Sequence, residues 1–424
     1  MRVAIIGAGF GGLTLAYRLS QKNVKVTIFE SAEKPGGLAI GFKKPSWDWT
    51  IEHHYHHWFT NDSAILGLAK EIGHKVITVR PKTSTFIDNN IYQLDSPLSL
   101  LLFNKLSIFE RLRTGVVLGY LKLTNNWKIL EQLSAKKFLV KSMGQNSWNI
   151  LWKPLFDGKF HEYASKIPAS WFWARIKKRT PALCYPEGGF AMFADRLVQK
   201  CIKNGVKIEY KTFVKSVKTA TGKIVVNTTK SDTEYDKIVV TSPSYIFSSM
   251  AHGLSGEYIK SLGGVRGLGA VNLMLSLKRP FLKDNSYWLN VNEKNYPFLA
   301  VVEHTNFMDK KYYGGEHLVF IGNYLDAHHP YFTKSANSML SEFIPYLQKI
   351  NADFKRGDVI DTFLFKAKYA QPIVPLNYSK KVPTFETPLK NVYLCNMSQV
   401  YPWDRGTNYA VENGEKVAHL VIGE

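Results

Sequence analysis

Cysteine and long apolar runs are both scarce in this chain. Its 424 residues include three cysteines, Cys184, Cys201 and Cys395, which lie far apart and form no CxxC pair. A disulfide framework or a zinc site is therefore not expected, and a reducing compartment fits this pattern. No apolar run reaches the roughly 18–20 residues of a transmembrane helix, and Met1 leads directly into a glycine motif without a signal peptide. The sequence predicts a cytoplasmic protein that is either soluble or bound peripherally to a membrane.

Acidic residues are also in deficit. The chain has 34 Asp and Glu residues against 55 Lys and Arg residues, which gives a formal net charge of +21. Such a charge suits a nucleic acid, an anionic membrane surface or an anionic substrate. The basic residues are dispersed rather than gathered in one arm, so a nucleic-acid partner is not expected. The hydrophobic content of 45% and the charged content of 21% are typical of a globular protein, and the length predicts two or three domains.

The first forty residues carry the most informative pattern. An apolar, β-branched run at residues 3–6 leads straight into a glycine-rich turn at residues 7–12, and leucines at helical spacing follow. A second apolar alternation spans residues 24–29, and Glu30 comes directly after it. Strand, glycine turn, helix, strand and acid at these spacings predict a βαβ unit that binds a dinucleotide. The cofactor contacts predicted for the turn are Gly7, Gly9, Phe10, Gly11 and Gly12.

Each residue type in this unit has a physical role. Gly7 permits a tight turn after the strand, and Gly9 leaves room for a pyrophosphate to approach the backbone. Gly12 lets the helix pack close to the sheet, and Glu30 is placed to accept hydrogen bonds from a ribose. The free N–H groups and the positive dipole at the helix N-terminus favour phosphate groups. The alternative is a glycine-rich turn in an α/β protein that binds no such cofactor.

A second glycine pair, Gly36 and Gly37, follows the acid. It marks another close approach of the backbone to a ligand, which is more typical of flavin nucleotides than of nicotinamide cofactors. Together with the first turn and Glu30, the pair resembles the N-terminus of the FAD-dependent amine oxidase superfamily. That superfamily includes protoporphyrinogen oxidases, phytoene desaturases and, more remotely, UDP-galactopyranose mutases. The resemblance implies that FAD is the cofactor and that Gly36, Gly37 and Leu38 contact it.

Residues 47–62 hold four histidines and three tryptophans. A metal site built from these histidines and Glu52 is one interpretation. Adjacent histidines on a strand point to opposite faces, however, and the aromatic setting suits a flat ring better, so no metal site is predicted. In the superfamily this stretch lies against the isoalloxazine ring, and His56 aligns best beside the flavin. The resemblance therefore makes His56 a cofactor contact and the candidate catalytic residue; the plainer alternative is a turn whose histidines are solvated or hydrogen-bonded.

The two stretches between the cofactor motifs are expected to form the substrate side. Residues 61–184 are predicted to be mainly helical. Within them, residues 98–123 are apolar with basic interruptions, which fits either a peripheral membrane face or helices packed around a substrate cavity. The basic and aromatic run at residues 171–179 predicts a helix of a capping domain, with a substrate-anion site as the alternative. Alternating runs between residues 262 and 370 predict an antiparallel sheet, which commonly roofs the flavin in the superfamily.

A later segment, which begins at residues 185–190, resembles the second FAD-binding part of the superfamily. The resemblance places the backbone of Val214 against the adenine. The helix predicted from residue 192 to 203 and the strands after it have the order found in that part.

The last segment has a strand near residues 391–396, followed by Asp404, Gly406 and Thr407. Relatives place a loop and a helix N-terminus beneath the flavin here, where the helix dipole stabilises negative charge. Most relatives carry a Gly-Asp or Gly-Glu pair after the strand, whereas this chain has Cys395, Asn396 and Met397 there. We therefore expect Asp404 to replace it as the acidic contact to FAD, Gly406 to allow close backbone approach, and Thr407 to cap the helix.

Three FAD segments in this order, separated by two inserts, predict the domain organisation. The fold class is α/β, with a Rossmann-like FAD-binding domain formed by residues 1–60, 185–250 and 385–424. Residues 61–184 and 251–384 form an inserted α+β substrate or capping domain. The resemblance implies an FAD-dependent oxidoreductase of the amine oxidase or desaturase type, which transfers a hydride from a C–N or C–C bond to flavin N5.

The substrate is bounded less tightly by the sequence. The apolar, aromatic inserts and the basic charge fit a hydrophobic small molecule, lipid-like or prenyl, that is taken from a membrane surface. One alternative is a flavin-dependent isomerase of a nucleotide-sugar, similar to the UDP-galactopyranose mutases. Another is a flavin-binding protein without turnover.

Overall fold

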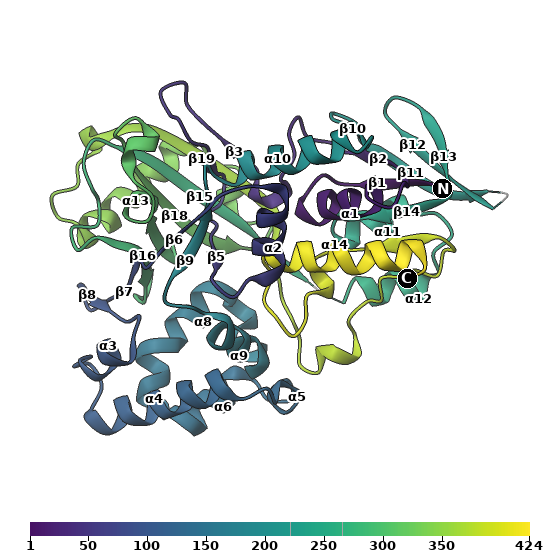
Figure 1. The fold of residues 1–424 in the computed structure, drawn as a ribbon. Coiled ribbons are helices and arrows are strands. Elements are labelled where there is room, and N and C mark those ends of the chain that lie inside the picture. Colours follow the sequence, from purple (N-terminus) through teal and green to yellow (C-terminus); the bar gives the residue numbers. More distant parts are fainter. Residues whose placement is uncertain (221, 265) are drawn as a thin grey trace.

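The computed structural model describes residues 1–220, 222–264 and 266–424. A five-stranded parallel sheet, in the order β10-β2-β1-β14-β20, lies on one side of the molecule together with both chain ends (Figure 1). Parallel neighbours need a crossover, and α1 (Phe10–Ser20) supplies the one between β1 and β2. All five strands fall within the three segments predicted for cofactor binding: β1 (Arg2–Ile6), β2 (Lys25–Phe29), β10 (Lys207–Glu209), β14 (Lys237–Val240) and β20 (Val392–Leu394).

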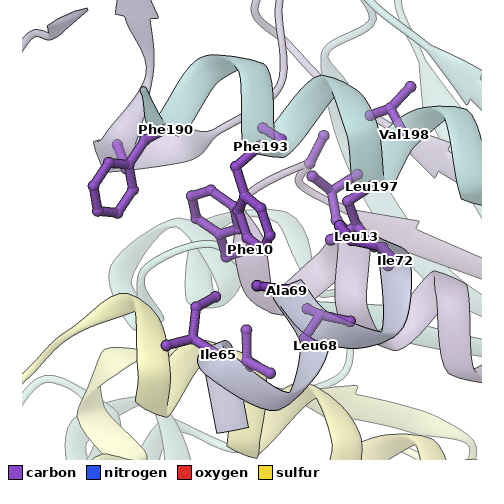
Figure 2. Close-up of a cluster of buried hydrophobic side chains, with 14 of the residues drawn as sticks. Phe10, Leu13, Ile65, Leu68, Ala69, Ile72, Phe190, Phe193, Leu197 and Val198 are labelled. Carbon is purple, nitrogen blue, oxygen red and sulfur yellow. The ribbon is translucent and has the colours of Figure 1, made fainter. Parts of the chain in front are cut away.

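Three helices share one apolar core beside this sheet. In Figure 2, side chains of α1 meet those of α2 (Ser63–Ile72) and α10 (Phe190–Lys203). The Phe10 ring stacks on Phe193, with ring centroids 5.5 Å apart. α2 follows the domain boundary predicted at residue 60, yet its buried face packs against the helices of the cofactor-binding half.

The last helix, α14 (Thr407–Ile422), lies directly against α1. The two helices are so close at this contact that a side chain would not fit between them. A Cβ atom on Gly414 would lie 2.6 Å from the carbonyl oxygen of Gly11. A Cβ atom on Gly11 would lie 3.2 Å from the carbonyl oxygen of Ala410. Both glycines thus remove a side chain from the same contact, which brings the first turns of the two helices together.

A seven-stranded sheet forms the other half of the molecule, in the order β19-β15-β18-β17-β16-β7-β8. The antiparallel pairing predicted for residues 262–370 is confirmed for β15 to β19. The sheet as a whole is mixed, because β7 pairs with β16 in parallel. Two of its strands, β7 and β8, come from the segment expected to be mainly helical. β7 pairs with β16, which lies about two hundred residues away in sequence, and β8 pairs with β7. The seven strands are β7 (Lys82–Ile87), β8 (Asn90–Gln93), β15 (Gly267–Leu277), β16 (Ser286–Val291), β17 (Ala300–Glu303), β18 (His317–Leu325) and β19 (Val359–Pro372).

A cluster of helices completes the capping half and has an apolar core of its own (Figure 1). It contains α3 (Pro97–Leu101), α4 (Ile108–Leu123), α5 (Trp127–Leu130), α6 (Ala135–Met143), α7 (Gln145–Ser147), α8 (Lys153–Phe160) and α9 (Ala169–Lys178). α3 begins after Ser96, whose hydroxyl accepts a hydrogen bond from the Ser99 N–H. Within the residues that the structure describes, no helix is both long and apolar enough to cross a bilayer.

Smaller elements connect these layers. Residues 214–220, 223–228 and 232–235 form a three-stranded antiparallel ribbon, and the short strands on either side of residue 55 pair with residues 41–42 and 183–184. All three cysteines are buried and free. The remaining elements are β3 (Gly41–Phe42), β4 (Ile51–Glu52), β5 (Trp58–Phe59), β6 (Val76–Val79), β9 (Leu183–Pro186), β11 (Val214–Ala220), β12 (Lys223–Thr228), β13 (Asp232–Tyr235), α11 (Ser244–Met250), α12 (Gly256–Leu262) and α13 (Ala336–Ile350).

Replacing the glycine at the α1–α14 contact tests how tightly the two helices pack. Gly414→Ala should lower the free energy of unfolding by about 1–3 kcal/mol, because the new Cβ atom meets backbone atoms that have no room to move. Gly67→Ala, inside α2, is the matched control. No described atom lies within 4 Å of its added Cβ atom, so it should raise stability by about 0.5–1 kcal/mol. Chemical denaturation measures both, and an unchanged Gly414→Ala protein would contradict the contact.

Candidate functional site

The glycine turn lies at the carboxyl end of β1, at one edge of the parallel sheet. Gly7 has a φ of +110°, and a Cβ atom on Gly12 would lie 2.1 Å from the Gly7 carbonyl oxygen. The turn itself therefore requires glycine at both positions. Around Gly9 the nearest described atom to an added Cβ is the Cα atom of Gly37, at 3.8 Å. An added Cβ atom on Gly9 would thus make only one ordinary contact, so the protein itself does not crowd this position.

The second glycine pair closes on this turn. The Gly36 N–H donates to the Ala8 carbonyl oxygen at 2.9 Å. Gly36 and Gly37 have φ values of +119° and +58°. A Cβ atom on Gly37 would lie 3.2 Å from the Cα atom of Gly9. The two glycine segments predicted to contact one ligand therefore touch each other, and the half-buried Leu38 follows directly.

Glu30 lies beside the same turn, after β2. Its carboxylate accepts hydrogen bonds from the N–H groups of Ala8, at 2.7 Å, and Ala32, at 2.8 Å. Its carbonyl oxygen accepts from the Thr212 N–H at 2.9 Å, which brings in the segment that leads to Val214. Val214 is buried as the first residue of β11. The structure thus gathers the predicted phosphate, ribose and adenine contacts at one edge of the sheet.

Phe10 occupies a different position from the other turn residues. Its side chain is 4% exposed and lies in the core of Figure 2, so its backbone is the part that remains near the turn. Gly9 is the N-cap of α1, and no side chain caps this helix. The first N–H groups of α1 are therefore left for a ligand, as phosphate binding at a helix N-terminus requires.

His56 lies in the loop between β4 and β5. A hydrogen bond joins its Nδ1 atom to the carbonyl oxygen of His54. Its ring centroid is 5.4 Å from that of Phe190, which also packs against Trp58 at 5.2 Å. The Trp58 Nε1–H donates to the Thr407 hydroxyl oxygen at 2.8 Å. Phe190 and Trp58 therefore link His56 to the start of α14, and the contact of His56 with the flavin stays a prediction.

The other histidines of this stretch each have a protein partner. His53 stacks on Phe365 with centroids 4.1 Å apart. A hydrogen bond joins the His57 Nδ1 atom to the Tyr287 hydroxyl at 3.1 Å, and another joins His54 to the amide of Asn272 on β15. Residues of the large sheet therefore contact three of the four histidines.

Glu52, the carboxylate of the metal hypothesis, is also fully engaged. It accepts hydrogen bonds from the Tyr185 hydroxyl at 2.8 Å and from the Phe190 N–H at 3.0 Å. Burial raises the pKa of Glu52 to about 7, although these donors favour the carboxylate. Among the described residues, no group of three or more His, Cys, Asp or Glu side chains is arranged to hold a metal ion.

The histidine side chains are surrounded by protein but are only half-buried. Burial lowers the pKa of His54 to about 3, that of His56 to about 4 and that of His57 to about 3. The positive charge of Arg405 lowers the pKa of His54 and His56 further. All three rings are therefore neutral at pH 7, so each offers one donor and one acceptor.

The start of α14 differs in one respect from expectation. Gly406 is the N-cap, with an extended backbone, and no side chain caps the helix. The prediction that Thr407 caps it is wrong, because Thr407 is already the first helical residue and its hydroxyl bonds Trp58 instead. The uncapped first turn leaves N–H groups and the positive helix dipole for the negative edge of a ligand. An added Cβ atom on Gly406 would lie 3.7 Å from Tyr409, which is an ordinary contact.

Asp404 points from this loop toward the capping helices. Its carboxylate lies 3.1 Å from the Arg175 Nη1 atom and 4.0 Å from the Lys159 Nζ atom, and accepts from the Gln371 amide at 3.3 Å. Burial alone would raise its pKa, but Lys159, Arg405 and Arg175 hold the pKa of Asp404 well below its usual range. Asp404 thus ties the last loop to the cap, and its contact with FAD stays a prediction.

Asp404 lies beside a group of basic side chains that we name the cation cluster. Its members are Lys159, Arg175, Arg179 and Arg405. Aromatic rings hold it together. The Lys159 Nζ atom lies 5.0 Å from the ring centroids of both Trp171 and Tyr324. Arg175 lies 5.1 Å from the Trp171 centroid, and Arg405 lies 5.1 Å from that of Tyr324. Such cation–π contacts stabilise positive charge away from bulk water.

The protonation of the cluster depends on its surroundings. Burial lowers the pKa of Lys159 well below its usual range, and the three arginines lower it further while Asp404 opposes them. Solvent reaches Arg179, yet the surrounding protein and Arg175 lower its pKa to about 10. The protein raises the pKa of Arg405, so the guanidinium groups of Arg179 and Arg405 both remain charged at pH 7.

The sequence singled out only part of this cluster. The basic and aromatic run at residues 171–179 was predicted to form a helix of the capping domain. In the structure Arg175 lies in the last turn of α9, and Arg179 follows it directly. Lys159 and Arg405 were missed as site residues. For Lys159, the sequence offers one signal: a lysine that lies between Phe156 and Phe160 on an apolar helix face.

Comparison with known proteins agrees with this geometry. A family model described as flavin containing amine oxidoreductase matches residues 10–422. No curated protein sequence matches the chain.

Solved structures show the same fold over almost the whole chain. A protein described as a candidate protoporphyrinogen oxidase from Exiguobacterium sp. 255-15 is 13% identical, with a TM-score of 0.79 and coverage of 100% of this chain and 99% of that one. Putrescine oxidase bound to putrescine is 14% identical, with a TM-score of 0.76 and full coverage of both chains. Reduced UDP-galactopyranose mutase is 14% identical, with a TM-score of 0.78 and coverage of 100% and 95%.

The family match spans nearly all of the sequence, and the structure supplies two touching glycine segments and two uncapped helix N-termini for a flavin dinucleotide. The chain therefore belongs to the flavin-containing amine oxidoreductase family and is an FAD-dependent oxidoreductase.

Proposed function

We propose that this enzyme removes a hydride from a C–N or C–C bond of a hydrophobic, lipid-like substrate that carries a negatively charged group. Bound FAD supplies the hydride acceptor. Gly7, Gly9, Gly36, Gly37 and Glu30 hold its dinucleotide part in this proposal, and the start of α14 holds the ring. The observation that carries the proposal is the cation cluster beside the histidine stretch.

The charge of the cluster selects the sign of the substrate. Asp404 is paired with Arg175 and Lys159, whereas no carboxylate among the described residues lies within 4.0 Å of Arg179 or Arg405 in an ion pair. Arginine presents a planar fork of donors that matches a carboxylate or a phosphate. A group of like charges also repels a cationic amine. The cluster therefore favours an anion and disfavours a polyamine.

The histidine stretch and the sheet above it supply the environment for the reacting part of the substrate. Tyr55, Trp288 and Phe365 are half-buried aromatic side chains around the neutral histidines. They offer apolar surface, while His56 offers a hydrogen bond without adding charge. We therefore assign to His56 the positioning of the substrate or of the flavin edge, and to the cation cluster the binding of the anionic group.

A nucleotide-sugar isomerase is the second candidate, because a diphosphate would also suit the cation cluster. Anaerobic titration separates the candidates. Reduction of the flavin by the substrate alone supports the oxidoreductase, whereas activity that needs prior chemical reduction and gives no net redox change supports the isomerase. A flavin that no lipid, amine or sugar nucleotide reduces would favour a flavin-binding protein without turnover.

Gly9→Val tests the cofactor cradle. The purified protein should be yellow and should release FAD, rather than FMN or NAD, on denaturation. Gly9→Val should lose the bound FAD, because its side chain fills the space that the phosphates need. Absorbance and mass spectrometry of the released cofactor measure this. Gly67→Ala is the control and should keep its FAD; stoichiometric FAD in Gly9→Val would show that the turn is misassigned.

Arg179→Gln tests the sign of the substrate. For an anionic compound that reduces the flavin, half-saturation should need roughly 10- to 100-fold more compound, because a charge-assisted hydrogen bond is lost. The limiting rate of reduction should change less. Lys203→Gln removes an equal charge from exposed α10 and should leave half-saturation unchanged. Two results would argue against the cluster as the anion site. One is the same half-saturation concentration in Arg179→Gln and Lys203→Gln, and the other is efficient reduction of the flavin by uncharged amines.

A further inference from the structure

We propose that α3, α4 and α5 form a docking surface for an anionic lipid bilayer. We name it the α4 face. This binding activity is separate from the proposed reaction, and it rests on exposed apolar side chains, their spacing, and the charges around them.

Exposed apolar residues are concentrated on this part of the chain. Of the 19 large apolar side chains that are exposed among the described residues, eleven lie between residues 98 and 133. Leu102, Val116 and Leu123 are 72%, 73% and 81% exposed. Scattered exposed apolar residues are normal on a protein surface, but a concentration of this size marks a surface that another body covers.

The spacing on α4 turns these residues into a stripe. Phe109, Leu112, Val116, Tyr120 and Leu123 recur at intervals of three or four residues and are all exposed, so they share one helix face. The buried residues Thr114 and Leu121 lie on the side that packs against the cap. α4 thus has an apolar face toward the protein and a second one toward solvent, where a helix of a purely soluble protein carries polar residues. Figure 1 shows α4 along the outer edge of the capping helices, away from the parallel sheet.

The charges around the stripe select an anionic surface. Residues 96–145 contain eight basic residues: Lys105, Arg111, Arg113, Lys122, Lys128, Lys136, Lys137 and Lys141. Their two acidic residues are both occupied, since Glu110 caps α4 at Ser107 and the buried Glu131 accepts from Ser379 and Tyr401. An apolar stripe flanked by lysines is the composition of a helix that lies in the headgroup region of an anionic bilayer.

Charge also argues against a second copy of this chain as the occupant. A copy with a net charge of +21 would bring a like-charged partner to a basic surface. Because no described helix can cross a bilayer, α4 would lie in the plane of the membrane rather than span it.

The α4 face is joined to the helix that carries Arg175. The Lys122 Nζ atom donates to the carbonyl oxygens of Ile176, at 3.3 Å, and Lys177, at 3.1 Å. In return, the Lys177 Nζ atom donates to the Leu123 carbonyl oxygen at 2.9 Å. The ends of α4 and α9 are thus tied together, so a bilayer under α4 lies next to the helix that leads to the cation cluster.

Vesicle cosedimentation of the full-length protein with its FAD tests the proposal. The protein should pellet with vesicles made of equal amounts of phosphatidylcholine and phosphatidylserine. It should pellet much less with phosphatidylcholine alone, and added salt should release it. No substrate or turnover is needed, so the result is independent of the proposed reaction.

Two pairs of substitutions locate the binding surface. Phe109→Gln with Val116→Gln should weaken binding to the mixed vesicles by roughly tenfold or more, because apolar area is removed while helix propensity is kept. Ile202→Gln with Phe213→Gln, which changes two side chains that are also more than half exposed but lie on the cofactor-binding half, is the matched control and should bind like the parent protein. Lys136→Gln with Lys137→Gln should weaken binding to the mixed vesicles and leave binding to phosphatidylcholine unchanged. Equal FAD content in all variants confirms that each is folded.

Three results would overturn the proposal. The first is no pelleting with the mixed vesicles. The second is equal loss of binding in the Phe109/Val116 and Ile202/Phe213 variants. The third is a parent protein that is dimeric in solution and becomes monomeric in the Phe109/Val116 variant, because the α4 face is then an interface between copies.

Discussion

Two helices from opposite ends of the chain touch through their backbones, and the cofactor site depends on this contact. Gly11 and Gly414 leave no side chain between α1 and α14, so the first turns of both helices come close together. One of these turns follows the glycine motif, and the other follows Gly406. Neither has a side-chain cap, so two sets of free N–H groups and two positive helix dipoles lie within reach of one extended ligand.

The two halves of the molecule use different chemistry. On the cofactor side, the groups predicted to face the ligand are mainly backbone atoms made accessible by glycine, together with the carboxylate of Glu30. On the cap side they are charged and aromatic side chains from α8, α9, β18 and the loop before α14. Asp404 links these halves, because its ion pairs with Arg175 and Lys159 hold that loop against the cap. A change in the cap that moves Arg175 would therefore also move the loop that precedes α14.

Local patterns made much of this fold predictable. The glycine turns, the strands of the parallel sheet, α10 and α14 each follow from a run of neighbouring residues. β7 and β8 were missed because both are short, and because β7 gains stability from β16, far away in sequence, while β8 pairs with β7. Thr407 failed as a cap because a shift of one residue in the helix start changes which side chain reaches the free N–H groups. Phe10 lies in the right turn, but its side chain serves the core.

The candidate site was less predictable than the fold, for a related reason. Lys159 and Arg405 come from segments 246 residues apart, and each becomes informative when Tyr324 on a third segment brings them together. A pattern of neighbouring residues cannot predict a contact between segments so far apart in sequence. The roles of His56, Val214 and Asp404 toward FAD come from the resemblance and remain predictions.

Lys159 gives the cation cluster a charge that varies with occupancy. In the free protein, burial and three arginines favour the neutral amine. A negatively charged group that enters the cluster reverses the local potential and raises the pKa of Lys159. Binding then draws a proton from solvent, and affinity for the anion weakens as the pH rises. In the proposed function the site would thus act as a charge regulator, in which the guanidinium groups attract the anion and the lysine takes up a proton as the anion binds.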